Sequence, residues 1–339
     1  MAAVLLFALA GGCSSTSAGA PPAGFLPSRS QSNPSQVALY VYGDTRDAFV
    51  ASYTLPASGH VAPRSVTRGS ATELRESHGG IALGPDGRLY VLENNPEALL
   101  VFAPNVSGNR KPERTALLPH GLYSGFALDP HGNFWTAEQT SRALERFSLA
   151  GHGVLQPSLV IATRMATPIG RLRAAPTTVA VRGSDVYCEC VVLHGGAQAI
   201  GITEYHVSVR NAVSIVRTFF DFLSPPLPEL PPSMLHVDAH SGTMYAAGIL
   251  EGYGVFAYAA GTPSGSAHHR RTIFGTATGL LHIESLTTDD QGRLYVATPK
   301  AVDVFASNAD GDVPPLFSIS DPDLLRYKAD QFGDFLVIR

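Results

Sequence analysis

The sequence predicts an all-β protein, a six-bladed β-propeller of four-stranded antiparallel blades, and two observations support this prediction. The first is a short segment that recurs six times along the 339 residues with one aromatic residue always in the same place. The aligned aromatic residues are Tyr40, Tyr90, Trp135, Tyr187, Tyr245 and Tyr295, which lie 45 to 58 residues apart. The second is the composition of 33 glycines, 25 prolines and only 15% charged residues, with 45% hydrophobic residues. Repeats of this length with turn-rich composition are typical of propeller blades.

The copy from Gly80 to Pro119 shows how one blade is built. The expected elements follow in order: an inner strand at 81–83, a tight turn at 84–87, a second strand at 88–92, a third strand at 98–103 and an outer strand at 114–118. The turn reads Gly-Pro-Asp-Gly, in which proline and aspartate favour the bend and Gly87 can take a positive φ. Four antiparallel strands in fewer than about fifty residues make one blade.

Two further signatures recur in register with the strands. Each expected third strand ends in an aromatic residue, namely Tyr53, Phe102, Phe147, Tyr205, Phe256 and Phe305. After it, four copies carry glycine followed by proline, at 59–63, 108–112, 153–157 and 311–315. Aromatic residues at regular strand positions indicate packing between blades, and proline after a glycine bend is tolerated where the chain enters an exposed outer strand.

The two ends of the repeat array predict how the ring closes. The first copy begins with a second strand at 38–42 and has no inner strand of its own. The segment 333–339 is an apolar strand left over after the sixth blade. We expect it to supply the missing inner strand of the first blade, which removes exposed sheet edges. Deletion of Phe335–Arg339 should therefore greatly lower thermal stability.

The N-terminal residues suggest export. Met1–Ala10 is almost wholly apolar and is followed by Gly11, Gly12 and Cys13. The apolar run has about the length of the hydrophobic region of an export signal and is too short to span a bilayer. Residues 9–15 resemble a bacterial lipobox, which implies lipidation of Cys13, although no basic residue precedes the run. An ordinary signal peptide with a chance cysteine is the alternative. Residues 14–35 indicate a Ser/Pro-rich tether, and 36–339 the propeller.

The remaining cysteines and the charge restrict the function classes. Cys188 and Cys190 are two residues apart on an expected strand, so their side chains leave the same face, and we expect packing between blades rather than a disulfide or a zinc site. The formal net charge is −4, and no basic run marks a nucleic-acid surface. We expect a monomer that does not bind nucleic acid.

Several segments resemble known propeller repeats. The stretches Gly-Pro-Asp-Gly-Arg-Leu-Tyr-Val at 84–91 and Val-Phe-Ala-Pro-Asn-Val-Ser-Gly-Asn-Arg-Lys-Pro at 101–112 are similar to NHL-type repeats of exported bacterial propellers. Residues 127–139 are similar to a blade of the virginiamycin B lyase family, and SMP-30/gluconolactonase-like propellers are broader relatives. The NHL-like resemblance covers about 36–339. It implies the fold, but one fold hosts many functions.

The resemblance to these enzyme families transfers poorly to single residues. The lyases use a His and a Glu-x-His pair in late blades together with a magnesium ion, whereas this chain has His282-Ile-Glu284 in the reverse order. The SMP-30-like enzymes hold a metal through Glu, Asn and Asp residues, and Asn94 is the one asparagine at a fitting place. The resemblance therefore leaves a divalent metal possible and its ligands unknown.

One face of a propeller, formed by the loops from second to third strand and from outer to next inner strand, usually holds the ligand. On these loops the strongest candidates for catalysis are His78, His282 and Glu284, which lie near the starts of inner strands. The further expected ligand-face residues are Glu93, Asn94, His120, Glu138, His194 and Glu251. Imidazole and carboxylate groups can bind a metal or exchange protons, although polar loop residues also occur without any role. Two long segments, Ala162–Pro176 and Phe222–Ser233, also lie on this face, as a lid, a docking ridge or a stiffened loop.

Together these observations favour an exported, lipid-anchored propeller at the cell envelope, periplasmic or extracellular, that acts as a non-catalytic module. Its ligand would be an envelope protein or a small molecule, and its membrane contact the lipid on Cys13. The alternative is a metal-dependent lyase or lactonase-type hydrolase that uses His78, His282 and Glu284.

Overall fold

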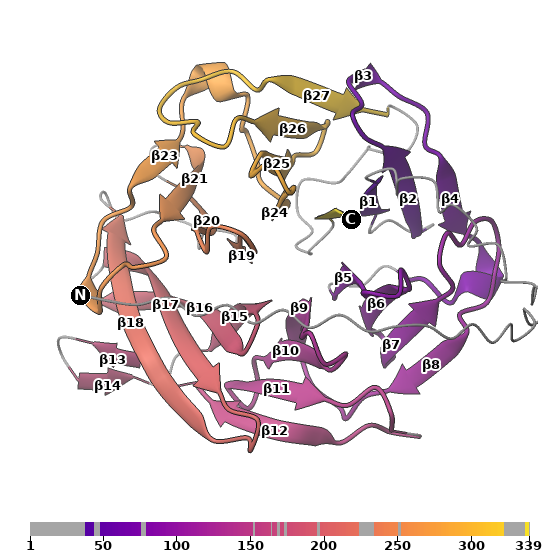
Figure 1. The fold of residues 1–339 in the computed structure, drawn as a ribbon, viewed down its shortest axis with the longest axis horizontal. Helices are drawn as coiled ribbons and strands as arrows, with labels where there is room; N and C mark the ends of the chain where they lie inside the picture. Colours follow the sequence, from indigo (N-terminus) through magenta and orange to yellow (C-terminus); the bar gives the residue numbers. More distant parts are fainter. Residues whose placement is uncertain are drawn as a thin grey trace, which may run out of the picture. The chain divides into compact units, whose positions relative to one another are not determined.

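Six sheets, each built on four antiparallel strands, form the blades of the unit Gln36–Arg339. The structure, a computed structural model, describes residues 38–43, 48–75, 79–151, 153–163, 165–167, 170–172, 175–194, 197–223, 234–249, 252–321 and 336–338. Figure 1 shows the sheets as blades around a centre, with strands such as β5, β9, β19 and β24 innermost. The fold is the predicted six-bladed β-propeller.

Each blade contains an inner, a second, a third and an outer strand, listed here in that order. Blade 1 is β28 (Leu336–Ile338), β1 (Ala38–Gly43), β2 (Phe49–Thr54) and β4 (Ser65–Arg68). Blade 2 is β5 (Gly80–Leu83), β6 (Leu89–Asn94), β7 (Glu97–Phe102) and β8 (Arg114–Leu117). Blade 3 is β9 (Tyr123–Leu128), β10 (Phe134–Glu138), β11 (Ala143–Phe147) and β12 (Pro157–Ala162).

The second half of the ring follows the same order. Blade 4 is β15 (Pro176–Arg182), β16 (Asp185–His194), β17 (Ala197–Val207) and β18 (Val213–Leu223). Blade 5 is β19 (Leu235–Val237), β20 (Met244–Ile249), β21 (Tyr253–Tyr258) and β23 (Arg271–Ile273). Blade 6 is β24 (Ser285–Thr288), β25 (Leu294–Ala297), β26 (Val302–Phe305) and β27 (Phe317–Ser320). No helix among the described residues is long and apolar enough to cross a membrane.

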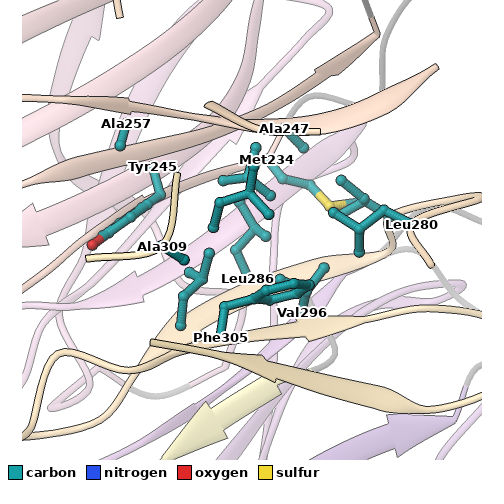
Figure 2. Close-up of a cluster of buried hydrophobic side chains, with 13 residues drawn as sticks. Met234, Tyr245, Ala247, Ala257, Leu280, Leu286, Val296, Phe305 and Ala309 are labelled. Carbon is teal, nitrogen blue, oxygen red and sulfur yellow. The ribbon is translucent and has the colours of Figure 1, made fainter. Parts of the chain in front are cut away.

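The recurrent aromatic residues lie in the cores between blades, as predicted. All six aligned aromatics are at most 8% exposed, and each joins a cluster that contains side chains of its own blade and of the next. Figure 2 shows the joint of blades 5 and 6, where Tyr245 and Ala257 of blade 5 lie close to Phe305 and Ala309 of blade 6. The hydrophobic core of this protein is thus a set of interfaces between neighbouring blades, here called joints. This arrangement explains why the aromatic pattern in the sequence repeats once per blade.

The C-terminal strand closes the ring, as predicted. Strand β28 pairs antiparallel with β1 through the partners Leu39 and Ile338, Tyr40 and Val337, and Val41 and Leu336. The inner edge of blade 1 is therefore covered by a segment from the other end of the chain.

The glycine–proline segments have a more specific role than entry to an outer strand. After its third strand, a blade sends a short segment, here called a strap, onto the outer strand of the preceding blade, where it pairs in parallel. The pairs are Gly59 with Ile319, Gly108 with Thr67, Val154 with Leu117, Gly265 with Phe219 and Gly311 with Ile273. The strap glycines Gly59, Gly108, Gly153, Gly265 and Gly311 have φ between 70° and 104°, a region that favours glycine.

Three details correct or extend the sequence predictions. The third strand of blade 5 ends at Tyr258, which occupies the place assigned to Phe256. Part of the long segment 162–176 forms a hairpin of β13 (Met165–Thr167) and β14 (Gly170–Leu172). Cys188 and Cys190 are free, buried thiols in the joint of blades 3 and 4, with their Sγ atoms 3.3 Å apart.

Candidate functional site

Glu284 is a buried carboxyl group directly before the innermost strand of blade 6. Its backbone N–H donates to the carbonyl of Ala297 at 2.9 Å, which fixes it beside the end of β25. The preceding Ile283 is fully buried in the joint of blades 5 and 6 and anchors the segment. The sequence prediction that Glu284 lies at the start of an inner strand is therefore confirmed.

Neither oxygen of the Glu284 carboxyl has a hydrogen-bond partner in the part of the chain that the structure describes. The residue is 1% exposed, and no described donor lies within hydrogen-bond distance of Oε1 or Oε2. Burial without a compensating charge raises the pKa of Glu284 to about 8, because removal from water disfavours the charged form. At neutral pH this carboxyl is mostly protonated. Buried polar groups are nearly always hydrogen-bonded, so a buried polar group without a partner indicates a site that binds water, an ion or a ligand.

His282 provides a second unbonded polar atom two residues earlier. Its Nε2 is buried and has no hydrogen-bond partner among the described residues, and its ring packs against Tyr253 of blade 5 with centroids 4.9 Å apart. Burial lowers the pKa of His282 below its usual value, so the imidazole is neutral at pH 7. Because both residues precede β24, the alternation of side chains along a strand does not govern their relative direction. Glu284 and His282 form the candidate site.

Glu138 lies on the same face but has a structural role. Its carboxylate accepts hydrogen bonds from the backbone N–H groups of Leu122 and Thr140, both at 3.0 Å, and of Ser141. Burial alone would raise the pKa of Glu138, but these hydrogen bonds and one from the Ser141 side chain outweigh burial and lower the pKa to about 2. The carboxylate is therefore charged at neutral pH, and its hydrogen bonds hold the segments around Leu122 and Ser141 together.

Glu93 and Asn94 also hold neighbouring loops in place. Glu93 is 1% exposed, and its Oε1 lies 3.4 Å from both the Tyr42 hydroxyl and the Arg75 backbone nitrogen. Asn94 donates through Nδ2 to the carbonyl of Tyr123 at 2.8 Å, which links blade 2 to blade 3. The structure assigns these two residues to the connection of blades.

The remaining predicted residues are not brought into this site. The His120 side chain is 97% exposed, and its Nδ1 lies 2.6 Å from Glu97 Oε1 at the surface. His194 is the last residue of β16, and its side chain is outside the described part. His78, Glu251 and Cys13 lie outside the described residues altogether.

The described residues do not offer a metal site. Among them, no three His, Cys, Asp or Glu side chains gather closely enough to hold an ion. A protonated carboxyl is also a poor metal ligand, because binding must first remove the proton. Glu284 and His282 alone therefore do not fit the metal that the resemblance implies.

Two grooves lie at the opposite end of the blades from Glu284. One of about 290 Å³ lies in the joint of blades 3 and 4, where it is lined by Trp135, Arg146, Val181 and Val207. Another of about 320 Å³ lies in the joint of blades 2 and 3 beside Tyr90 and Arg114. Both open at the turns between inner and second strands, so these two grooves lie away from the predicted ligand face.

Sequence analysis did not identify Tyr253 as part of the candidate site. It is the first residue of β21, and its ring meets His282 across the joint of blades 5 and 6. At the positions that strand register makes equivalent to Tyr253, the other blades have no aromatic residue. This departure from the repeat was the sequence signal that could have identified Tyr253.

Comparisons with known proteins agree with the fold. No family model and no curated protein sequence matches the chain. A crystal structure of a protein from Lactobacillus plantarum matches with a TM-score of 0.50 and 11% identity over 90% of this chain and 98% of that one. A streptogramin B lyase structure matches with a TM-score of 0.43 and 10% identity, over 70% of this chain and 69% of that one. A protein described as a proposed gluconolactonase matches with a TM-score of 0.45 and 12% identity, over 77% and 87%. At 11% identity the likeness to the Lactobacillus plantarum protein shows the fold alone.

Proposed function

We propose that the propeller is a non-catalytic binding module whose candidate site, Glu284 and His282, takes a small uncharged polar molecule. The observation that carries this proposal is the set of three buried, unbonded polar atoms: both carboxyl oxygens of Glu284 and Nε2 of His282. A folded protein keeps such atoms without partners at a cost, and a bound molecule would supply the missing hydrogen bonds.

The protonation states select the kind of ligand. With the pKa of Glu284 raised to about 8 and that of His282 lowered, both groups are uncharged at pH 7. A neutral carboxylic acid donates one hydrogen bond and accepts others, and a neutral imidazole nitrogen donates or accepts one. Hydroxyl, amide and lactone groups match this pair. An anion gains no charge partner here, and a cation must first displace the proton of Glu284.

A panel of four probes tests the ligand class at pH 7. We expect D-glucose or δ-gluconolactone to raise the midpoint of thermal unfolding of the protein, and sodium gluconate and methylamine to leave it unchanged. Glu284→Leu should abolish the shift and His282→Ala should weaken it. Glu113→Gln, at a carboxylate 46% exposed on the surface, is the matched control. A shift caused only by the charged probes, or kept in Glu284→Leu, would refute this assignment.

The second candidate function is an enzyme of lyase or lactonase type. A carboxyl with a pKa near 8 and a neutral imidazole two residues earlier in the chain are groups that acid–base catalysis also uses. If δ-gluconolactone disappears faster with the wild-type protein than with Glu284→Leu, turnover replaces simple binding. The metal-dependent form of this alternative needs ligands beyond the described residues.

We further propose that this module acts at the cell envelope. The support is the apolar run Met1–Ala10 and the lipobox-like residues up to Cys13, followed by a tether long enough to separate a propeller from a membrane. The partner classes remain a small molecule at the candidate site or an envelope protein on the surface.

A further inference from the structure

The joint of blades 3 and 4 lacks a strap within the described part of the chain. The five other joints each have one, but in blade 4 the third strand returns to the outer strand by a tight turn. In this turn the N–H of Ser208 donates to the carbonyl of Ala212, and the N–H of Asn211 donates to the carbonyl of Ser208, both at 2.9 Å. The turn contacts blade 3 through Asn211, whose Oδ1 accepts a hydrogen bond from Arg146 Nη2 at 2.8 Å, but among the described residues it has no segment that pairs with the outer strand of blade 3.

The outer strand of blade 3, β12, therefore keeps a bare edge. By strand register, the residue of β12 equivalent to the strap-paired Ile319, Thr67, Phe219 and Ile273 is Ile161. Among the described residues, β12 pairs on one side only, with β11. An unpaired edge of this kind is a template for another extended chain.

The five straps show which backbone groups of β12 are available. Straps donate to the carbonyl before the paired position, as Gly108 does to Val66 at 2.7 Å, or after it, as Ala267 does to Phe220 at 2.8 Å. On β12 these acceptors are the carbonyls of Val160 and Ala162. One strap also accepts, since the N–H of Phe274 donates to the carbonyl of Gly311 at 3.3 Å. The equivalent donor on β12 is the N–H of Ala162.

The edge strand carries apolar side chains. Val160, on β12 itself, is 53% exposed. Leu159 is partly buried against the core of the joint, beside which the 290 Å³ groove opens over Trp135. Straps approach their outer strand from the end of a third strand, which is the end of the blades where this groove lies. A segment arriving from outside would thus enter past the groove.

We propose that β12 binds an extended segment of a partner protein, added parallel to Val160–Ala162 in the place of the missing strap. The chemistry of the segment follows from the five straps: a glycine with positive φ, and an aliphatic residue close to it that packs into the joint. Leu155 and Ala267, two residues after their glycines, are 3% and 6% exposed, and Val61 and Val313 pack in the same manner. Strand addition of this kind gives affinity through the backbone and specificity through side-chain pockets.

A second copy of this chain fits the edge less well. Two β12 strands related by a twofold axis would pair antiparallel, whereas all five straps pair in parallel. The remaining outer strands of the described chain already carry straps. An extended segment of a different protein is therefore the occupant that the joint accommodates.

The test uses a strap of this chain as the probe. A fluorescein-labelled peptide with the sequence of residues 103–112, Ala-Pro-Asn-Val-Ser-Gly-Asn-Arg-Lys-Pro, is titrated into the full chain and followed by polarisation. We expect saturable binding below about 1 mM, and none for a peptide of the same composition with the order scrambled. Ala162→Pro removes the outward N–H at a solvent-facing edge position, where proline is tolerated. It should weaken binding at least tenfold, while Ala162→Ser should not.

A second variant, in which a strap is grafted into blade 4, controls for the chance that Ala162→Pro acts by disturbing the fold. Replacing residues 209–211 by the blade 6 strap, residues 306–315, fills the joint from within. It should abolish peptide binding and raise the midpoint of thermal unfolding. Failure of the peptide to bind, or equal binding to Ala162→Pro with an unchanged melt, would overturn the proposal. A concentration-dependent dimer that Ala162→Pro dissociates would assign the edge to a second copy instead. Binding only after removal of residues 1–35 would assign it to this chain's own N-terminal segment.

Discussion

Replacing Glu284 with glutamine is expected to raise the midpoint of thermal unfolding, and to raise it more as the pH increases from 4.5 to 8. The wild-type carboxyl is buried and unbonded, with its pKa raised from 4.5 to about 8. Between these two values the unfolded chain releases the proton of Glu284 while the folded chain retains it. Stability therefore falls with rising pH over this window. Glutamine does not titrate, so the stability of the variant does not fall with rising pH through this group.

The size of the effect follows from the shift. One pKa unit corresponds to about 1.4 kcal/mol, so a shift from 4.5 to about 8 sets an upper limit of about 5 kcal/mol at pH 8 and above. Below pH 4.5 the acid and the amide are both neutral, and the two proteins should melt together. Thermal melts of the wild-type and variant proteins at half-unit pH intervals measure this difference.

Glu138→Gln is the control with the opposite sign. Because hydrogen bonds lower the pKa of Glu138 to about 2, its carboxylate stabilises the fold above pH 4.5, and this contribution is lost as the pH falls towards 2. The glutamine variant should be destabilised at pH 7, by about 1–3 kcal/mol. If Glu284→Gln behaved like Glu138→Gln, Glu284 would have to be bonded in the native protein.

Deletion of Phe335–Arg339 is expected to lower the melting midpoint of the whole propeller by about 10 °C or more. The deletion removes β28 and so uncovers the inner edge of β1 across Leu39, Tyr40 and Val41. Closure by β28 couples the two ends of the chain, and each blade depends on its neighbours for its core. The truncated protein should also aggregate more readily through the bare edge.

A variant with Leu336–Ile338 replaced by Val-Thr-Val separates the role of the backbone from that of the sequence. It keeps the ladder with β1 and should melt close to the wild type. A truncated protein that melts within a few degrees of the wild type would show that the ring does not depend on this strand.

Most of the fold was predictable because every blade solves the same packing problem. A residue such as Tyr90 or Tyr295 meets equivalent neighbours in each joint, so the sequence repeats the solution in register. The closure by Leu336–Ile338 was predictable for a related reason: an incomplete first blade and a surplus last strand complement each other. The error at Phe256 arose because Tyr258, two residues on and on the same side of the strand, also fits an aromatic position.

The state of the candidate site was not predictable from the sequence. Glu284 and Glu138 are both buried carboxyl groups at strand ends on one face, yet among the described residues one has no hydrogen-bond partner and the other accepts several hydrogen bonds. This difference depends on how the backbone of neighbouring loops turns, which residue types do not reveal. The sequence offered His282 and Glu284 as candidates because they lie near the start of an inner strand, but the directions of their pKa shifts depend on burial.

The bare edge of β12 had a sequence signal that is clear only once the straps are known. The glycine–proline segment occurs after the third strands of blades 1, 2, 3 and 6 but not after Tyr205. Blade 5 uses another order, with Pro263 before Gly265. The missing glycine–proline segment in blade 4 becomes informative because the structure shows that each strap covers the outer strand of the preceding blade.

The pKa of Glu284, measured directly, tests the central claim that its buried carboxyl is unbonded and uncharged at neutral pH. The carboxyl carbon resonance of Glu284, assigned by its loss in Glu284→Gln, can be followed from pH 4 to 9 with and without 10 mM MgCl₂. The account predicts a titration midpoint near pH 8 that magnesium does not move. A midpoint near the ordinary value of 4.5, or one that magnesium lowers below pH 7, would contradict the account and favour a charged, metal-dependent site.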